Sequence, residues 1–200
     1  LDYLILTHGD ADHMGESENI VKHFKVNRVL INSGSLVDLE EKLIKILEDF
    51  NIKYDYLKQG DVIRIKDYSF YALNSGSHLT ENDCSIVLYT KINNYRLLLT
   101  GDISTKVEKE LTDAYPGLEV DILKLGHHGS ITSTSELFLE TIKPKYGIIS
   151  VGLKNNFNHP SPIVTDRLNR LEIKTLQTSL NGSIKMIFGL NDVTIWRMLT

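Results

Sequence analysis

Hydrophobic residues along the first part of the chain alternate between two spacings, one typical of strands and one typical of helices. A nearly continuous apolar stretch over 2–7 predicts a strand that is buried on both faces. A short helix is expected over 16–24 and a second strand over 26–32. Apolar residues then recur at helical spacing and predict an amphipathic helix over 36–50. The order of elements is therefore mixed, with helices lying between strands.

The remaining pattern predicts a strand-rich middle, followed by alternating strands and helices. Short strands are expected near 53–57, 61–66 and 68–73, and a hairpin of 84–91 with 95–100 around Asn93-Asn94. Later strands are expected at 120–125, 145–151, 174–178, 183–188 and 193–197. Helices are expected at 103–115, 134–142 and 162–171, the last with Ser161 as N-cap and Pro162 at its first position. We expect an α/β chain forming one domain over 1–200, with two sheets and helices outside them.

The composition is that of an ordinary globular domain. Of the 200 residues, 42% are hydrophobic and 24% are charged, so the chain can bury a sizeable core. No apolar stretch approaches the roughly 18–20 residues that cross a bilayer, so direct membrane insertion of this segment is not expected. The single cysteine, Cys84, excludes an internal disulfide framework and is interpreted as a small apolar residue on a strand. Because Leu1 is not an initiator methionine and a strand begins at once, we expect the chain to be truncated at its N-terminus.

Charge is unevenly distributed along the chain. The net charge is −4, but residues 143–200 hold eight Lys and Arg against three Asp and Glu, which gives this part +5. A basic part beside an acidic part that could hold cations is compatible with an anionic substrate. No polybasic run with interleaved aromatic residues occurs, so sequence-specific reading of a nucleic acid is not indicated.

Polar residues with ligand chemistry follow four of the predicted strands. The set comprises His8, Asp10, Asp12 and His13 after 2–7, Asp102 after 95–100, His127 and His128 after 120–125, and Asn155 and His159 after 145–151. Loops at strand ends are where open α/β sheets place their sites. Neutral imidazoles and carboxylates are the ligands that hold hydrolytic divalent metals. The pattern therefore predicts a metal site formed by the strand-end loops.

Several of these residues also have simpler interpretations. Asp102 could be the N-cap of the 103–115 helix, although a metal pair needs a bridging carboxylate. Ser130 and Thr134 could form a phosphate cradle at a helix N-terminus, or simply cap that helix. His159, which precedes Pro160, could be an ordinary surface histidine. The spacing alone leaves these alternatives open.

Taken together, the motifs resemble the metallo-β-lactamase superfamily. They are His8-x-Asp10-x-Asp12-His13, Gly101-Asp102, His127-His128-Gly129-Ser130 and Asn155-x-x-x-His159-Pro160. Within the superfamily they resemble the hydrolase domain of ComEC-type DNA-uptake competence proteins and its stand-alone relatives. The resemblance implies an αββα sandwich with the metals at one edge of two sheets, and the family's opening strands before the first motif are missing from this chain.

The resemblance also implies a ligand set. One divalent ion, Mn²⁺ or Zn²⁺, would be held by Asp12, His13, Asp102 and His128, and a second by His8, Asp10 and Asp102. The chain departs from the superfamily at Asp10, where histidine is usual, and the usual third histidine of the first metal site is not found before the 84–91 strand. Asn82, Asp83 and Ser85 stand there instead.

The function implied is a two-metal phosphodiesterase, a nuclease acting on single- or double-stranded DNA without sequence preference. Asp12, His127 and His159 are the expected catalytic residues, and Ser130, Thr134 and Asn155 are expected to contact the substrate. One alternative is a hydrolase of small phosphocholine-type esters, lactones or thioesters. The other is a non-catalytic module of a DNA-uptake channel. A ComEC-type protein would place the domain at the extracytoplasmic face of the cell membrane, beside a channel domain; a stand-alone relative would be cytoplasmic or secreted.

Overall fold

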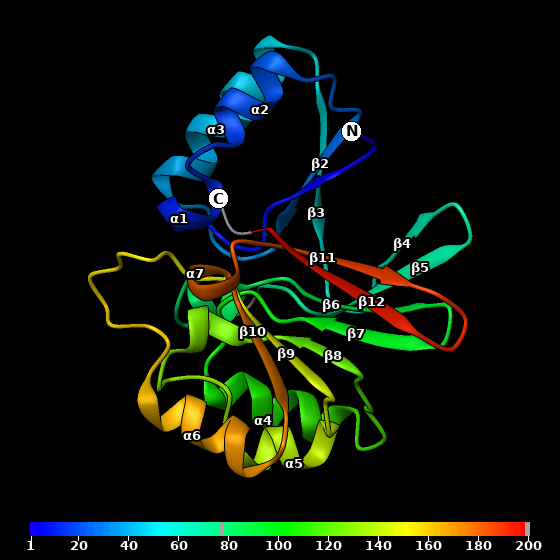
Figure 1. Cartoon of the computed structure of the whole chain (residues 1–200). Helices are drawn as coiled ribbons and strands as arrows, with labels where there is room; N and C mark the ends of the chain where they lie inside the picture. The colour runs from blue at the N-terminus through cyan, green and yellow to red at the C-terminus, as the bar shows by residue number, and fades with distance from the viewer. Residues whose placement is uncertain (77, 199–200) are drawn as a thin grey trace. The chain divides into compact units, whose positions relative to one another are not determined.

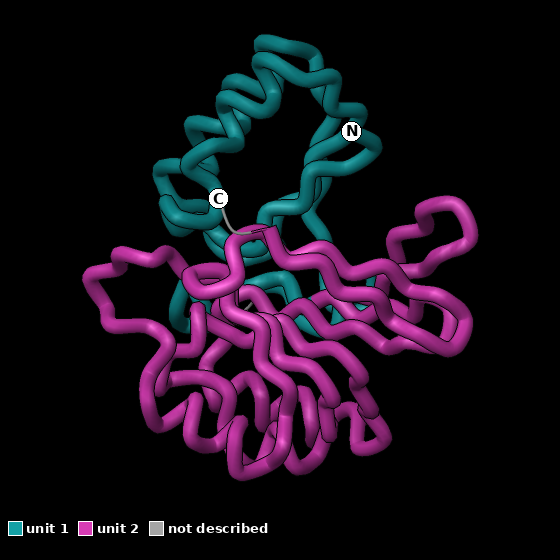
Figure 2. Tube along the Cα trace, in the orientation of Figure 1, with its two compact units in different colours: residues 1–61, 72–87 teal, residues 62–71, 88–200 magenta. Residues whose placement is uncertain are grey.

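The computed structural model describes residues 1–76 and 78–198. The chain separates into two compact units, which Figure 2 colours differently. Unit 1 comprises Leu1–Asp61 and Ala72–Val87, and unit 2 comprises Val62–Tyr71 and Leu88–Thr200. Among the described residues, no helix has both the length and the apolar character needed to cross a membrane.

Unit 1 is built on a three-stranded parallel sheet in the order β1-β2-β3. Its strands are β1 (Leu4–Ile5), β2 (Arg28–Asn32) and β3 (Lys53–Leu57). The helices α1 (Ala11–Met14) and α2 (Ser17–His23) join β1 to β2, and α3 (Asp38–Asp49) joins β2 to β3. Parallel neighbours need such crossover connections, so the alternation seen in the sequence becomes a βαβαβ unit.

The core of unit 1 lies between this sheet and its helices. Val29 and Ile31 of β2 are fully buried and belong to one cluster with Leu43 and Leu47 of α3, as the helical spacing predicts. Among the described residues β1 pairs only with β2, and both of its residues are half-buried. The expectation of a strand buried on both faces is therefore wrong, because Leu4 and Ile5 keep part of their surface exposed.

Unit 2 contains most of a seven-stranded sheet in the order β10-β9-β8-β7-β6-β5-β4. Its strands are β4 (Val62–Ile65), β5 (Tyr68–Asn74), β6 (Val87–Ile92), β7 (Tyr95–Leu99), β8 (Ile122–Lys124), β9 (Tyr146–Ile149) and β10 (Lys174–Gln177). The ends of β5 and β6 at residues 72–74 and 87 belong to unit 1. β6 pairs with β7 antiparallel, whereas β7, β8, β9 and β10 are parallel.

Three helices cover the parallel part of this sheet. α4 (Thr105–Ala114), α5 (Glu136–Ile142) and α6 (Pro162–Arg170) lie together beside β8–β10 (Figure 1). Each presents buried apolar residues, such as Val107, Phe138 and Leu168. These helices and strands match the predicted ones to within one to three residues at their ends.

A separate two-stranded hairpin follows the one-turn helix α7 (Thr178–Asn181). Its strands are β11 (Ser183–Phe188) and β12 (Val193–Met198), which pair only with each other. Asn93 Nδ2 donates to the carbonyl of Phe188 at 2.7 Å and holds the hairpin tip. The described residues thus form three sheets rather than the expected two, since alternation in a sequence predicts a strand but not its partner.

Cys84 does not lie on a strand, contrary to expectation. It belongs to η1 (Asn82–Cys84), a turn of 3₁₀-helix, where its N–H donates to the carbonyl of Glu81 at 3.0 Å. Strand β6 begins only at Val87. The side chain is buried, as expected, and burial raises the pKa of its thiol, which fits a packing residue rather than a nucleophile.

Candidate metal centre

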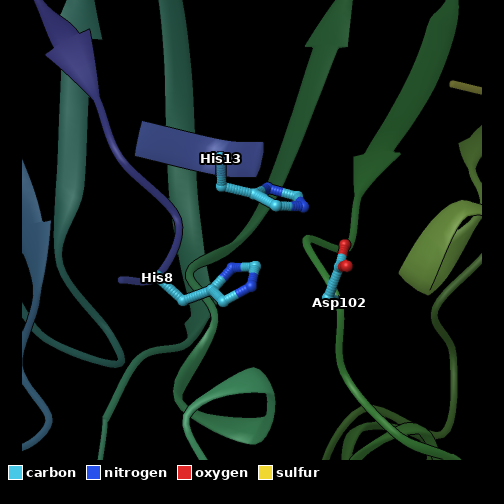
Figure 3. Close-up of side chains that lie close together, drawn as sticks. All are labelled: His8, His13 and Asp102. Carbon is cyan, nitrogen blue, oxygen red and sulfur yellow. The ribbon is translucent and has the colours of Figure 1, made fainter. Parts of the chain in front are cut away.

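Four predicted ligands belong to unit 1, and we call them the N-terminal half-site: His8, Asp10, Asp12 and His13. His8 follows β1 and is completely buried. The carbonyl of Asp10 accepts hydrogen bonds from the N–H groups of His13 and Met14, both at 3.0 Å, and so begins α1. This single turn brings His13 back to His8, and the two ring centroids lie 4.2 Å apart (Figure 3).

Hydroxyl groups hold both rings of this half-site at the same nitrogen. Thr7 Oγ1 lies 3.1 Å from His8 Nδ1 and 3.3 Å from His13 Nδ1. Ser85 Oγ lies 3.2 Å from His8 Nδ1 as well. A ring held at Nδ1 offers its other nitrogen to a metal, which is the usual arrangement of histidine ligands.

The Nε2 atoms of the same rings face carboxylates. His8 Nε2 lies 3.6 Å from Asp10 Oδ2, and His13 Nε2 lies 3.9 Å from Asp12 Oδ2. The carboxylates themselves are about half exposed, with side-chain exposures of 49% for Asp10 and 65% for Asp12. Nitrogens of one buried and one partly buried ring beside accessible oxygens form a donor set that a cation can reach from solvent.

Gly9 allows this loop to run close to its neighbours. A Cβ at position 9 would lie 2.2 Å from Cγ2 of Val37, which no real side chain tolerates. The Gly9 N–H donates to Glu81 Oε1 at 2.7 Å and ties the loop to residues far along the chain. The glycine of the motif is therefore required by close packing next to the ligands.

The remaining predicted ligands and catalytic histidines belong to unit 2, and we call them the C-terminal half-site: Asp102, His127, His128 and His159. They follow β7, β8 and β9, which are parallel neighbours in the sheet. The carboxyl ends of parallel strands meet at one edge, so residues far apart in sequence come together there. Figure 3 shows Asp102 just beyond a strand end, from which its buried carboxylate projects.

His128 is oriented by two contacts. Its Nδ1 lies 2.7 Å from the carbonyl oxygen of Ser150, and its Nε2 lies 3.4 Å from Asp102 Oδ2. A carbonyl only accepts hydrogen bonds, so Nδ1 carries the proton in this contact. Nε2 is then the metal-binding nitrogen, and it points toward the carboxylate predicted to share the ion.

The backbone that carries these histidines is strained. In the turn η2 (Gly126–Gly129), the φ angles of His127 and His128 are +47° and +54°, and that of Gly129 is +79°. A non-glycine residue in this region costs about 1–3 kcal/mol and is typical of functional sites. A Cβ at Gly129 would lie 2.7 Å from Pro160 Cβ, so this glycine lets the turn pack against the loop that carries His159.

His159 lies among the other histidines of its half-site. Its ring centroid is 5.6 Å from that of His127 and 6.5 Å from that of His128. Burial lowers the pKa of His159, and its histidine neighbours lower it further, whereas Asp102 opposes them. Asn155 is expected to contact substrate. Its Oδ1 accepts a hydrogen bond from the His159 N–H at 2.8 Å, and its Nδ2 donates to the His159 carbonyl at 2.9 Å. These contacts make Asn155 a brace of the loop, and its substrate role stays a prediction.

The expected phosphate cradle at the start of α5 is already engaged. Glu108 of α4 is buried and accepts hydrogen bonds from the N–H groups of Thr134 and Ser135. Burial raises the pKa of Glu108, and the hydrogen bonds from Ser135 and Thr134 counteract that effect. The chain's own carboxylate therefore occupies these two amides, and the phosphate cradle stays a prediction. Ser130 and Thr134 are both buried, and their contact with substrate stays a prediction.

Sequence reasoning identified the ligand types but missed the groups that hold them. These are Thr7, Ser85, Glu108 and the carbonyl of Ser150. Ser85 is a partial exception, because it is one of the residues that stand in the region of the usual third histidine of the first metal site, and its hydroxyl contacts His8. The other groups carry no sequence signal, because a carbonyl is present at every position and Glu108 resembles any other helical glutamate.

The donor chemistry of the half-sites fits a divalent metal ion. Each half-site combines imidazole nitrogens with carboxylate oxygens, and the histidines characterised above are held at Nδ1 with Nε2 offered. Such mixed nitrogen and oxygen sets suit Zn²⁺ and Mn²⁺. The residues present therefore fit the kind of ion that the resemblance implies.

Comparison with known families agrees with this geometry. Residues 1–152 match the model of the Metallo-beta-lactamase superfamily. The chain belongs to this superfamily, as its motifs indicated, and the fold is that of metal-dependent hydrolases. The expected fold class is confirmed.

Individual relatives show which members of the superfamily the chain is similar to. The chain is 38% identical over 188 residues to ComE operon protein 3 of Bacillus subtilis, covering 92% of this chain and 24% of that protein. It is 32% identical over 199 residues to Competence protein ComA of Neisseria gonorrhoeae, covering 99% of this chain and 27% of that protein. The chain thus spans about a quarter of the length of these relatives. Among solved structures, the metallo-beta-lactamase fold protein YhfI of Bacillus subtilis matches with a TM-score of 0.56 and 13% identity, over 88% of this chain and 74% of that one.

Proposed function

We propose that this chain is a metal-dependent phosphodiesterase that cleaves DNA. The observation that carries the proposal is His128, fixed by the Ser150 carbonyl with its Nε2 directed at the buried carboxylate of Asp102. A histidine prepared in this way at the edge of three parallel strands has the form of a metal ligand rather than of a surface residue.

The resemblance implies one or two divalent ions, and we take the proposed ligands from it. Asp12, His13, Asp102 and His128 are the proposed ligands of one ion, and His8, Asp10 and Asp102 those of the other. A bound divalent ion supplies Lewis acidity, which activates water and offsets negative charge on phosphoryl oxygens. Because Asp10 adds a hard oxygen ligand, we propose that Mn²⁺ supports turnover better than Zn²⁺.

The histidines outside the ligand set have separate proposed roles. Burial and the neighbouring histidines lower the pKa of His159, which favours the neutral ring that can accept a proton or a hydrogen bond. We assign His127 and His159 to the phosphate and the leaving oxygen, where the histidine that has taken up a proton delivers it to the leaving oxygen as the ester bond breaks. Asp12 is the ligand proposed to orient the attacking water as well.

DNA as substrate rests on the relatives and on charge. One relative is named a competence protein, and the resemblance to DNA-uptake proteins points the same way. The +5 charge of residues 143–200 lies in unit 2, which carries the C-terminal half-site. As part of a longer protein, the domain would act beside a membrane channel at the extracytoplasmic face. Contacts through phosphates would be insensitive to base sequence and would weaken as salt rises.

The test uses metal-free chain reloaded with Mn²⁺ or Zn²⁺. Hydrolysis of a DNA oligonucleotide is measured beside a phosphocholine p-nitrophenyl ester and a chromogenic β-lactam, with bound metal counted on the same samples. DNA cleavage that needs metal and is nearly abolished by Asp102→Ala supports the proposal. His23→Ala is the matched control, because His23 lies exposed on α2 away from the predicted ligands. Activity that persists in excess chelator with no metal bound would refute it.

One observation favours a small-ester hydrolase as the second candidate. Unit 1 has an open pocket of about 480 Å³ beside the first metal motif, lined by Asp10, Asp38 and Glu81 together with Val37 and Leu39. Carboxylates around an apolar floor suit a cationic headgroup such as a choline ester. Hydrolysis of the phosphocholine ester without DNA cleavage would make this candidate the better one.

A further inference from the structure

The loop at residues 152–160 in unit 2 holds an exposed aromatic ring in a defined position. Phe157 is 77% exposed, yet its ring lies 5.8 Å from that of His159 at an interplanar angle of 18°. The His159 ring in turn lies 6.5 Å from that of His128 at 20°. The three rings are thus nearly parallel and lead from the solvent-exposed Phe157 to the proposed metal ligand His128.

Polar contacts hold the loop on either side of this ring. Asn155 bridges the loop through hydrogen bonds to both backbone groups of His159 and to the carbonyl of Gly152. An exposed phenyl ring forgoes the free energy of burial, which is about 1.5–3 kcal/mol for a side chain of this size. Exposed apolar side chains are common in this chain, and Phe157 differs from them in the row of rings that leads from it through His159 to His128.

The same loop also carries a positive charge. Lys154 is exposed, three residues before Phe157. Proteins that bind single-stranded nucleic acid combine cations, which follow the phosphate backbone, with aromatic faces, on which bases stack. The sequence shows no long basic and aromatic run, but one loop carries an exposed cation and, three positions later, an exposed aromatic ring that stacks on His159 of the C-terminal half-site.

We propose that Phe157 is a base-stacking platform and that the substrate of this site is single-stranded DNA. This inference rests on the proposed function and narrows its substrate, because the resemblance does not distinguish single-stranded from double-stranded DNA. An unpaired base can stack on Phe157, extending the row of rings, while Lys154 contacts a neighbouring phosphate. Bases in a duplex are already stacked and paired, so they cannot use the platform without unpairing.

The experiment distinguishes binding through the bases of DNA from binding through its phosphate backbone. Binding to metal-free chain is measured by fluorescence anisotropy, and cleavage by the Mn²⁺-loaded chain is measured alongside. The probes are a labelled single strand, the matching duplex, and a strand of the same length made of abasic sites. Phe157→Ala, Phe157→Leu and Phe157→Trp are compared with Leu153→Ala, an equally exposed residue of the same loop at 78%.

The expected result is a selective loss. Phe157→Ala and Phe157→Leu should lower the preference for the intact over the abasic strand by roughly 5- to 100-fold, the range for one stacked base. Phe157→Trp should keep that preference, and Leu153→Ala should leave it unchanged. Lys154→Gln should instead weaken intact and abasic strands equally and reduce the salt dependence by about one ion.

Three outcomes would overturn the inference. Phe157→Ala could weaken binding of the intact and the abasic strand equally, or Phe157→Leu could keep the full preference for the intact strand. The third outcome is that the wild-type chain binds the duplex as tightly as the single strand. The binding arm needs neither metal nor turnover, so it remains informative if the chain cleaves nothing. Absence of metal-dependent cleavage with an intact stacking preference would refute the proposed phosphodiesterase and leave the platform standing.

Discussion

Replacing Asp121 should destabilise unit 2 without touching the proposed metal ligands. This buried carboxylate accepts hydrogen bonds from the Arg96 N–H at 3.0 Å and from Arg96 Nε at 2.9 Å, and it lies 3.1 Å from Lys145 Nζ. Its position just before β8 joins the starts of β7 and β9. These strand starts lie at the opposite ends of β7–β9 from Asp102 and His128.

The magnitude follows from which contacts are protected from solvent. Lys145 has a 69% exposed side chain, so its ion pair contributes about 0–1 kcal/mol. Hydrogen bonds to a buried charged group are worth about 1.5–3 kcal/mol. We therefore expect Asp121→Asn to lower the free energy of unfolding by about 3 kcal/mol, equivalent to roughly 6–12 °C in Tm for a chain of this size.

The same residue predicts a pH dependence. Burial raises the pKa of Asp121, but the hydrogen bonds from Arg96 and Lys145 outweigh it and hold that pKa well below its usual range. A lowered pKa in the folded state contributes stability above the unfolded value near 3.9, and the contribution is lost as pH falls toward the folded value. The stability gap between the wild type and Asp121→Asn should therefore shrink below about pH 4.

Urea unfolding followed by circular dichroism at pH 7 and at pH 2.5 measures both effects. Asp113→Asn is the matched control, because Asp113 makes an exposed pair with Lys109 and should change stability little. A loss below about 1 kcal/mol at pH 7, or an equal loss at both pH values, would show that the Arg96 contacts do not stabilise the sheet as reasoned here.

The other predictions concern the site itself. His159→Ala should lower turnover while leaving bound metal unchanged, because His159 is placed on the substrate; loss of metal by elemental analysis would overturn that role. Asp10→His should shift the activity ratio of Mn²⁺- to Zn²⁺-loaded chain toward Zn²⁺, since a softer nitrogen replaces a hard oxygen; an unchanged ratio would contradict this. Gly129→Ala should cost about 2 kcal/mol or more, because its φ is +79° and the new Cβ would lie 2.7 Å from Pro160 Cβ; denaturant unfolding without loss would show that the turn relaxes.

Most elements of the fold could be predicted because hydrophobic spacing reports which face each element buries. The helix α3 shows this, since Leu43 and Leu47 are buried as their spacing indicates. The start of β6 could not be predicted, because hydrogen bonds within η1 delay it to Val87 despite apolar residues before it. The separate β11–β12 sheet was equally hidden, since its partners are set by long-range contacts such as Asn93 with Phe188.

The candidate site, too, could be predicted only in part: its residue types could be predicted from the sequence, but the orientation of their side chains could not. Histidine and aspartate at strand ends are visible in a sequence, because few other functions require them together. Their orientation is not visible, because it depends on groups such as the Ser150 carbonyl, which lies 22 positions from His128. The inferred stacking role of Phe157 arises in the same way, since only the structure aligns its ring with that of His159.

These observations explain why unit 2 can keep a strained turn at its functional edge. β8 begins at Ile122, directly after Asp121, whose buried charge-assisted contacts fix the strand between β7 and β9. The strand ends at Lys124 and leads into the turn that carries His127 and His128, whose left-handed backbone costs free energy. Stabilising contacts at the start of a short strand hold its far end in place, so the turn cannot relax without breaking the sheet. The histidines are then directed by the packing of the whole unit rather than by their local preference, which is the preorganisation that a metal site requires.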